Sequence, residues 1–288
     1  MRIILKNKNG CFEIGGASHP NARIQAIKGL GVPAKETKTV TFSSQPGVTL
    51  QSTRDSSRTI TMSFDFYGAQ RETENLYKII YEPVEILFFS GPYRRKISGV
   101  CTSTAEAESI IYHQWQKIAL QFMCPDPYFS DFESISAPIE QKTDHFPNLY
   151  ENGTWYINLP AIATTHIADA TITNKGSVAV YPIIRVYNSA AAVTIPTVFG
   201  LVLTNGSGAK ITLKHNISKG ETVTFDLPKR KITSDISGDI TSKISDDTIL
   251  GDFKLLPGDN LISAKNLNTA DDITATIEYT NKYAAVVI

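Results

Sequence analysis

The sequence lacks the charge imbalance and the long apolar runs that would indicate binding to nucleic acid or to a membrane. Its 28 lysine and arginine residues equal its 28 aspartate and glutamate residues, so the formal net charge is zero. A neutral chain exerts no overall attraction on nucleic acid or anionic lipid. No apolar run approaches the length of a transmembrane helix. We therefore expect neither nucleic acid nor membrane as a partner, and we expect shape and local patches to determine which partners the protein binds.

Cysteine is also scarce. Cys11, Cys101 and Cys124 lie far apart, and none forms a Cys-x-x-Cys pair or stands near a histidine at metal-ligand spacing. The N-terminal residues 1–6 read as a short strand rather than a secretion signal. An odd number of cysteines in such a chain favours reduced, mostly buried thiols and assembly in a reducing cytoplasm. A bond between Cys101 and Cys124 would require that their strands pair.

Catalytic and cofactor-binding motifs are missing as well. The sequence has no Gly-x-Ser-x-Gly, phosphate loop or dinucleotide fingerprint in a suitable context. A zinc site or a catalytic triad would depend entirely on the fold, because the five histidines are scattered: His19, His113, His145, His166 and His215. Four aspartates lack the spacing of a calcium loop and are better interpreted as a solvated loop: Asp246, Asp247, Asp252 and Asp259. We expect no enzyme activity, no cofactor and no metal site.

The length of 288 residues favours two domains, each able to bury its own core. We assign residues 1–130 to a first domain, 131–165 to a linker rich in proline and charge, and 166–288 to a second domain. The clearest helix covers 70–81, with apolar residues at helical spacing and Pro83 after its end.

Residues 34–67 predict a long projecting hairpin arm or loop. Two alternating runs, 37–42 and 59–66, flank a polar stretch, 51–58, that has too little apolar surface to be core. A polar excursion between strands projects from the surface. We expect it to reach a neighbouring subunit, with four polar residues as candidate contacts: Gln51, Arg54, Asp55 and Arg58.

The first domain ends in an apolar strand that two prolines interrupt. Ile118, Leu120 and Phe122 recur at period two and place three apolar side chains on one face. Pro125 and Pro127 then fix their own φ and remove backbone donors, so the strand cannot continue. The segment of interest is Cys124, Pro125, Asp126, Pro127, Tyr128 and Phe129. A carboxylate between two prolines is more simply a turn residue than a catalytic acid.

The second domain shows short β runs separated by turn residues, which is the pattern of a β-sandwich. The basic cluster of Arg94, Arg95 and Lys96 in the first domain has no interleaved aromatic residues. We interpret it as a solvated or subunit-facing strand edge rather than a nucleic-acid site.

A strand that runs into Cys-Pro-Asp-Pro-Tyr-Phe near the middle of a β-rich chain resembles the distal tail protein family of long-tailed bacteriophages. The order of strand, polar hairpin, strand and helix in the first domain agrees with this resemblance. So do several segments of the second domain, namely 174–176, 181–186, 220–226 and 256–260, so the resemblance covers nearly the whole chain. The polar run 234–247 departs from it.

This resemblance implies a mainly β protein with a tail-tube-like first domain, containing one helix, and a galectin-like sandwich. It implies a non-enzymatic structural protein of a phage tail tip or tail-like particle, assembled in the bacterial cytoplasm. Six copies would form a ring that joins the tail-tube protein to the tail-associated tip protein, and the second domains would hold receptor-binding or baseplate proteins.

Two other functions are weighed against this one. A galectin-like sandwich binds sugar when an exposed tryptophan stacks on a pyranose ring, but Trp115 and Trp155 both precede the sandwich, which disfavours carbohydrate binding. A cell-wall hydrolase would require a convergent acid pair or a metal, and no sequence feature indicates either.

Overall fold

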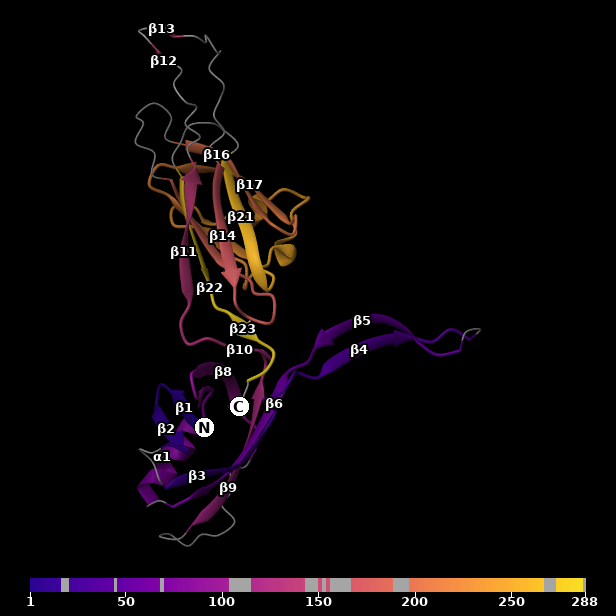
Figure 1. The fold of residues 1–288 in the computed structure, drawn as a ribbon, viewed down its shortest axis with the longest axis vertical. Coiled ribbons are helices and arrows are strands. Elements are labelled where there is room, and N and C mark those ends of the chain that lie inside the picture. The colour runs from indigo at the N-terminus through magenta and orange to yellow at the C-terminus, as the bar shows by residue number, and fades with distance from the viewer. Residues whose placement is uncertain are drawn as a thin grey trace. The chain divides into compact units, whose positions relative to one another are not determined.

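The computed structural model describes residues 1–16, 21–43, 46–67, 70–103, 115–142, 150–151, 154–155, 167–188, 197–266 and 273–286 (Figure 1). The fold is mainly β, as expected, and α1 (Gln70–Ile80) is the one α-helix among these residues. Two compact units divide the chain. Unit 1 comprises Met1–Phe132 together with Lys282–Ile288, and unit 2 comprises Glu133–Asn281. No helix in the described ranges is long and apolar enough to cross a membrane.

Unit 1 is built on one sheet with the strand order β2-β1-β7-β8-β9-β6-β3, to which β10 and β23 are added. Neighbouring strands pair antiparallel, and alternate residues of β6 and β9 are buried, as the period-two pattern predicts. The strands are β1 (Arg2–Asn7), β2 (Gly10–Ile14), β3 (Ala22–Lys28), β6 (Arg58–Phe66), β7 (Val84–Ser90), β8 (Tyr93–Cys101), β9 (Gln116–Cys124), β10 (Phe129–Ser130) and β23 (Lys282–Tyr283).

Helix α1 completes the core of unit 1. Leu76 and Ile79 are fully buried among the strands, and Ile80 is nearly so. The side-chain amide of Asn7 donates to the carbonyl of Ile79 at 2.7 Å, which satisfies a backbone acceptor at the end of the helix. The predicted helix is therefore confirmed, ending one residue earlier than expected.

The projecting hairpin has a different register from the one predicted. It consists of β4 (Lys35–Val40) and β5 (Thr49–Asp55), which pair with each other and with no other strand of the described residues. The run 37–42 thus pairs with the polar stretch, and the turn lies at 41–48 rather than at 51–58. A ribbon exposed on both faces needs no apolar alternation, which is why the polar residues form a strand. We call residues 35–55 the arm.

Unit 2 is a β-sandwich around one core. Its ten-stranded order is β17-β16-β21-β14-β11-β22-β15-β18-β19-β20. Residues Ile135–Ile139 of β11 pair with β22, whereas Glu140–Lys142 pair with β14, so this strand joins the two halves. The strands are β11 (Ile135–Lys142), β14 (Ile167–Asn174), β15 (Ile183–Asn188), β16 (Thr197–Asn205), β17 (Lys210–Ser218), β18 (Thr222–Asp226), β19 (Lys231–Ser234), β20 (Gly238–Asp239), β21 (Gly258–Asn266) and β22 (Ile273–Tyr279).

Two short strands and two 3-10 helices complete the described part of unit 2. Strands β12 (Tyr150–Glu151) and β13 (Thr154–Trp155) pair with each other. The polar run 234–247, expected as a loop, contains β20 and the 3-10 helix η1 (Thr241–Lys243), because Ile240 is buried in the core. A second 3-10 helix, η2, covers Leu250–Asp252.

The unit boundaries differ from the expected domains in two places. Residues 135–142 of the expected linker form β11, since Ile139 is buried and Ile135 and Ala137 pack against the core despite Pro138. Residues 282–288, expected in the second domain, return to unit 1, where Tyr283 pairs with Phe129. The chain therefore passes between the units twice, near residue 132 and again near residue 281.

Candidate assembly site

The structure brings the Cys-Pro-Asp-Pro-Tyr-Phe segment to the base of the arm. Cys124 is the last residue of β9 and lies opposite Arg58, the first residue of β6. The two prolines form the turn between β9 and β10. Phe129 begins β10, is fully buried, and packs edge-on against Phe88 with ring centroids 5.7 Å apart. Residues 124–129 therefore anchor the turn in the core of unit 1.

Asp126 acts as the turn residue that the sequence favoured. Its Oδ1 accepts the backbone N–H of Tyr128 at 3.1 Å. Its Oδ2 lies 2.6 Å from Nζ of Lys282, on the returning strand β23. Because both side chains are partly exposed, this ion pair adds little stability, and its main effect is to connect the turn to β23.

Tyr128 connects the same turn to the arm. Its hydroxyl donates a hydrogen bond to the carboxylate of Asp55, the last residue of β5. Burial, followed by this bond and by the charges of Asp55 and Asp126, raises the pKa of Tyr128 to about 12. The phenol therefore stays protonated, and remains a donor, at neutral pH.

Arg58, predicted as a contact on the projecting hairpin, is instead buried beneath its base, with 4% of its surface exposed. Its guanidinium donates to four backbone carbonyls at 2.5–2.6 Å, those of Gly29, Gly31, Pro127 and Ala284. It also lies over the ring of Phe129, 4.5 Å from the centroid. Burial lowers the pKa of Arg58 from its ordinary value, while Cys124 opposes this effect. A buried cation is tolerated here because oriented carbonyls replace its hydration shell.

Arg95 contacts the two segments of unit 1 that lie next to the unit boundaries in the chain, at Asp131 and at Tyr283. Its guanidinium donates to Asp131 at 2.6 Å and stacks 3.6 Å from the ring centroid of Tyr283. Tyr283 in turn donates to the other oxygen of Asp131 at 3.2 Å. In the basic cluster at 94–96, β7 pairs along one side, whereas on the other side only Lys96 pairs, with Ser130 of β10. Arg94 is exposed, and Arg95 has an internal partner in Asp131.

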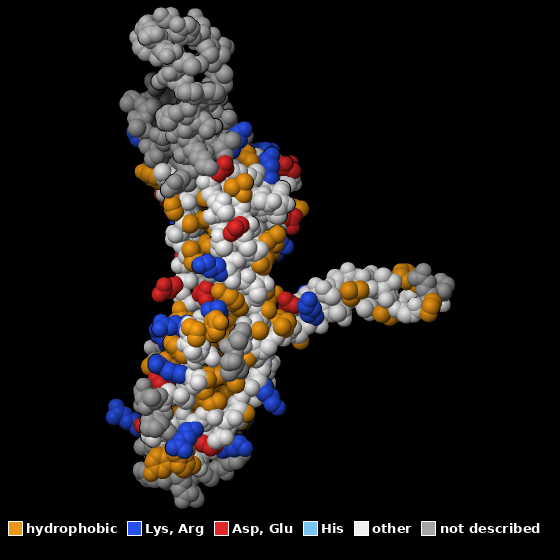
Figure 2. Space-filling model, viewed as in Figure 1, with side chains coloured by type: hydrophobic (Ala, Val, Ile, Leu, Met, Phe, Trp, Pro, Cys, Tyr) orange, Lys and Arg blue, Asp and Glu red, His pale blue; other side chains and the backbone are white. Residues whose placement is uncertain are grey.

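The arm itself is almost entirely exposed, and three of the four predicted contact residues lie on it. Gln51, Arg54 and Asp55 belong to β5, and Arg54 forms an exposed ion pair with Glu36 across the ribbon at 2.6 Å. Sequence reasoning missed three apolar side chains toward the tip of the arm, which are 52%, 65% and 58% exposed: Phe42, Val48 and Leu50. Figure 2 shows that hydrophobic side chains are present on the surface of the arm. Isolated apolar residues within a polar stretch were the available signal.

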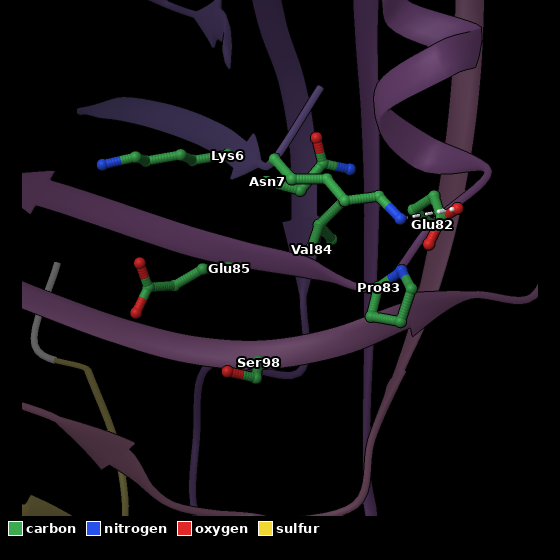
Figure 3. Close-up of a pocket in the computed structure, with 8 residues that line it drawn as sticks. Lys6, Asn7, Glu82, Pro83, Val84, Glu85 and Ser98 are labelled. Carbon is green, nitrogen blue, oxygen red and sulfur yellow. Dashed lines mark ion pairs between the residues drawn. The ribbon is translucent and has the colours of Figure 1, made fainter. Parts of the chain in front are cut away.

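A hollow in unit 1 lies beside the end of α1 and is lined by residues of β1, β7 and β8 (Figure 3). Both carboxylates that line it have cationic partners: Glu82 lies 3.2 Å from Lys8, and Glu85 lies 3.2 Å from Lys96. Within the described ranges, no three histidine, cysteine or acidic side chains gather as a metal site.

One buried polar cluster in unit 2 was not anticipated. His215 contacts Glu221 through Nε2 at 2.9 Å and Lys243 through Nδ1 at 3.1 Å, and Ser234 donates to Glu221 at 2.5 Å. Burial opposes ionisation of Glu221, but bonds from Ser234, His215 and a backbone N–H outweigh it and lower its pKa. The serine bonds the carboxylate instead of the histidine, so the cluster is not a catalytic triad. The other four histidines lie outside the described residues.

All three cysteines are free. Cys11 is exposed, whereas Cys101 is half-buried and Cys124 is buried. Strands β8 and β9 do pair, but Cys101 lies opposite Phe122, so the register does not place the two thiols across from each other.

Comparison with known proteins identifies related folds. Residues 175–283 match the family model of the siphovirus-type tail component, C-terminal domain. The crystal structure of the SPP1 Dit protein, described as a paradigm of the hub adsorption apparatus in phages that infect Gram-positive bacteria, is 15% identical, with a TM-score of 0.65 over 98% of this chain and 99% of that chain.

Two weaker likenesses come from phage P2 baseplates in the activated conformation. The form with calcium is 10% identical, with a TM-score of 0.49 over 99% of both chains. The form with strontium is 9% identical, with a TM-score of 0.45 over 96% of this chain and 97% of that chain. No curated protein matches the chain.

The mainly β fold shared with SPP1 Dit extends along nearly the whole chain. The family match covers most of unit 2 and begins just after β14. Together they confirm the predicted resemblance to the distal tail protein family: residues 175–283 match a domain model of siphovirus tail components, and the fold is shared with SPP1 Dit.

Proposed function

We propose that this chain is a non-enzymatic hub protein of a phage tail tip, six copies of which form a ring through unit 1. The ring joins the tail-tube protein to the tail-associated tip protein, and unit 2 of each copy holds a receptor-binding or baseplate protein. The protein resides in the virion and is assembled in the host cytoplasm. The observation that carries the proposal is the arm, an exposed ribbon that a single copy leaves without a partner surface.

The arm lacks the covering layer that would keep it ordered in an isolated copy. A two-stranded hairpin without a covering layer is marginally stable in water. Both outer edges of the arm present backbone groups that no described strand pairs, and such edges readily add another chain. The arm also exposes Phe42, Val48 and Leu50, whose burial would stabilise a contact.

A second copy of this chain is the partner that fits. Each copy carries one arm, and an arm that contacts a different surface on the next copy makes a head-to-tail interface. Head-to-tail interfaces close into rings when the rotation between copies divides a full turn. Unit 1 therefore has the asymmetric contact that ring formation needs.

Light scattering on the full chain and on one arm variant tests this proposal. The variant combines Phe42→Ser, Val48→Ser and Leu50→Ser, which removes the apolar contact without touching the core. We expect a closed oligomer of six copies for the natural chain and a monomer with unchanged circular dichroism for the variant. Deleting residues 51–58 would be a poor test, because it removes the buried Arg58.

The matched control replaces two apolar residues of unit 2 that are each 64% exposed, Ile236→Ser with Ile249→Ser. This control should keep the mass of the natural chain. A natural chain that stays monomeric at its highest soluble concentration, or an arm variant that keeps the oligomer, contradicts self-assembly through the arm.

Carbohydrate binding remains the second candidate, because two tyrosines are about 40% exposed beside an ion pair of unit 2. Tyr187 lies two positions after Arg185 on β15, and Tyr181 lies four positions before it. Arg185 contacts Glu278 at 2.6 Å. Aromatic rings beside charged donors can bind a sugar. Loss of binding on a glycan array by Tyr181→Ala and Tyr187→Ala, with Trp115→Ala in unit 1 as the control, would support this function over the hub.

A further inference from the structure

Three separate chain segments of unit 1 meet at the guanidinium of Arg58. Gly29 and Gly31 belong to the segment that leads into the arm, Pro127 to the turn after β9, and Ala284 to the returning C-terminal segment. Arg58 itself follows the arm by three residues. One side chain thus holds the two ends of the arm, the path into unit 2 and the path back from it.

The surrounding contacts extend this connection in both directions. On the arm side, the hydroxyl of Tyr128 donates to Asp55, and the backbone N–H of Ser56 donates to the carbonyl of Ala34 at 2.9 Å. On the returning side, Asp126 pairs with Lys282, and the backbone N–H of Val286 donates to the carbonyl of Leu30 at 3.0 Å. The two contacts on the arm side do not involve residues 282–286.

We propose that Arg58 and residues 124–129 form a coupling junction, which transmits the position of the arm to the two segments that lead into and out of unit 2. The physical basis is the burial of the guanidinium. A carbonyl that moves away leaves a charged donor unsatisfied in a site of low dielectric, which costs far more than an exposed bond. The four carbonyls are therefore expected to move together rather than singly.

This coupling deepens the proposed hub function, because an arm held by a neighbouring copy would stiffen the segments that carry unit 2. Coupling between two sites requires one element whose state both sites bias. Here that element is the turn at 125–127, held by Tyr128 from the arm side and by Lys282 from the returning side.

Amide hydrogen exchange on the full chain tests the coupling. Tyr128→Phe removes the bond to Asp55 and leaves the ring in place. We expect exchange to accelerate by roughly three- to tenfold at Ser56, the local reporter, and by a smaller but measurable factor at Val286, the distant reporter. In an Arg58→Gln background, the same substitution should leave Val286 without further change.

The control is Arg54→Gln, which breaks an exposed ion pair of the arm that does not touch the junction. It should leave Val286 unchanged. If Arg58→Gln prevents folding, Arg58→Lys replaces it, because a lysine keeps the charge but cannot reach four carbonyls. The proposal is overturned if Tyr128→Phe accelerates amide exchange at Ser56 and leaves exchange at Val286 unchanged. It is also overturned if Tyr128→Phe changes exchange at Val286 equally with and without Arg58.

These measurements are made at a concentration at which light scattering shows a single species. Exchange within one chain can therefore fail to show coupling even if the ring forms, and it can show coupling even if no ring forms. The two proposals thus fail separately.

Discussion

Cys124 lies at the end of β9, where its thiol is fully buried beside the guanidinium of Arg58. Burial raises the pKa of Cys124 to about 11; the charge of Arg58 opposes this and that of Asp126 adds to it. The environment of a cysteine is thus set by its position in the fold. Cys11 is also a free thiol, but it is exposed, whereas Cys124 is buried.

The raised pKa predicts a loss of stability in alkali. The folded chain binds the thiol proton more tightly than the unfolded chain, so this contribution is fully present below about pH 9 and is lost as the pH rises to about 11. In urea unfolding, the free energy of unfolding of unit 1 should decrease by about 1 kcal/mol between pH 8 and pH 10 because of this thiol. Cys124→Ala should reduce the decrease, whereas Cys101→Ala should not.

Gly29 gives a second prediction for a single residue. Its φ is +90°, and a Cβ there would lie 2.1 Å from the carbonyl oxygen of Thr59. Gly29→Ala should therefore lower the free energy of unfolding of unit 1 by about 3 kcal/mol, since both the backbone and the contact are strained. Gly31→Ala is the matched control, because nothing lies within 4 Å of its Cβ position. Equal denaturation midpoints for the two variants would contradict this account.

Among elements, β11 and the arm show how local pattern and tertiary context compete. The stretch 131–165 has the prolines and charges of a linker, yet Ile139 is buried, with 3% exposed, and β11 joins both halves of the sandwich. The arm shows the converse, because residues of good strand propensity form a ribbon that packs on no core. Neither outcome follows from the composition of the segment.

The structural role of β11 predicts a selective loss of stability. Ile139→Ala removes a buried side chain at the point where the strand changes partners, so unit 2 should lose about 2–4 kcal/mol of its free energy of unfolding, and unit 1 should be unaffected. Chemical denaturation, followed by amide hydrogen exchange in each unit, measures the free energies of unfolding of both units. Ser136→Ala, exposed on the same strand, serves as the control. If Ile139→Ala leaves the free energy of unfolding of unit 2 unchanged, this stretch is better interpreted as a linker.

For the whole molecule, the return of the C-terminus makes unit 1 depend on residues at both ends of the chain. Unit 2 lies within unit 1 in sequence, between β10 and β23. Two arginines, Arg58 and Arg95, bind the returning residues from different strands. The stability of unit 1 therefore depends on residues that follow unit 2 in the chain.

A truncation tests this dependence. A chain that ends at Asn281 loses the partner of Phe129 in β23 and one carbonyl bonded to Arg58, so unit 1 should be destabilised by about 3 kcal/mol. The melting of unit 2 should not change, because its core contains no residue beyond 281. Lys282→Gln removes only the exposed ion pair to Asp126 and should have little effect. An unchanged unit 1 in the truncated chain would contradict the role assigned to the return.

The sequence by itself determined the fold class, the helix, the end of β9 and the resemblance to the distal tail protein family. Period-two runs, helical spacing and proline act over a few residues, so they can be read locally. The tertiary structure alone decided that the polar run 49–55 pairs with 35–40, that β11 enters the sandwich, and that residues 282–288 return to unit 1. It also decided that Arg58, expected on the surface, lies buried. These features depend on pairings between segments as far apart as Arg58 and Ala284, and the carbonyls that make burial of a charge tolerable come from chain segments that only folding brings together.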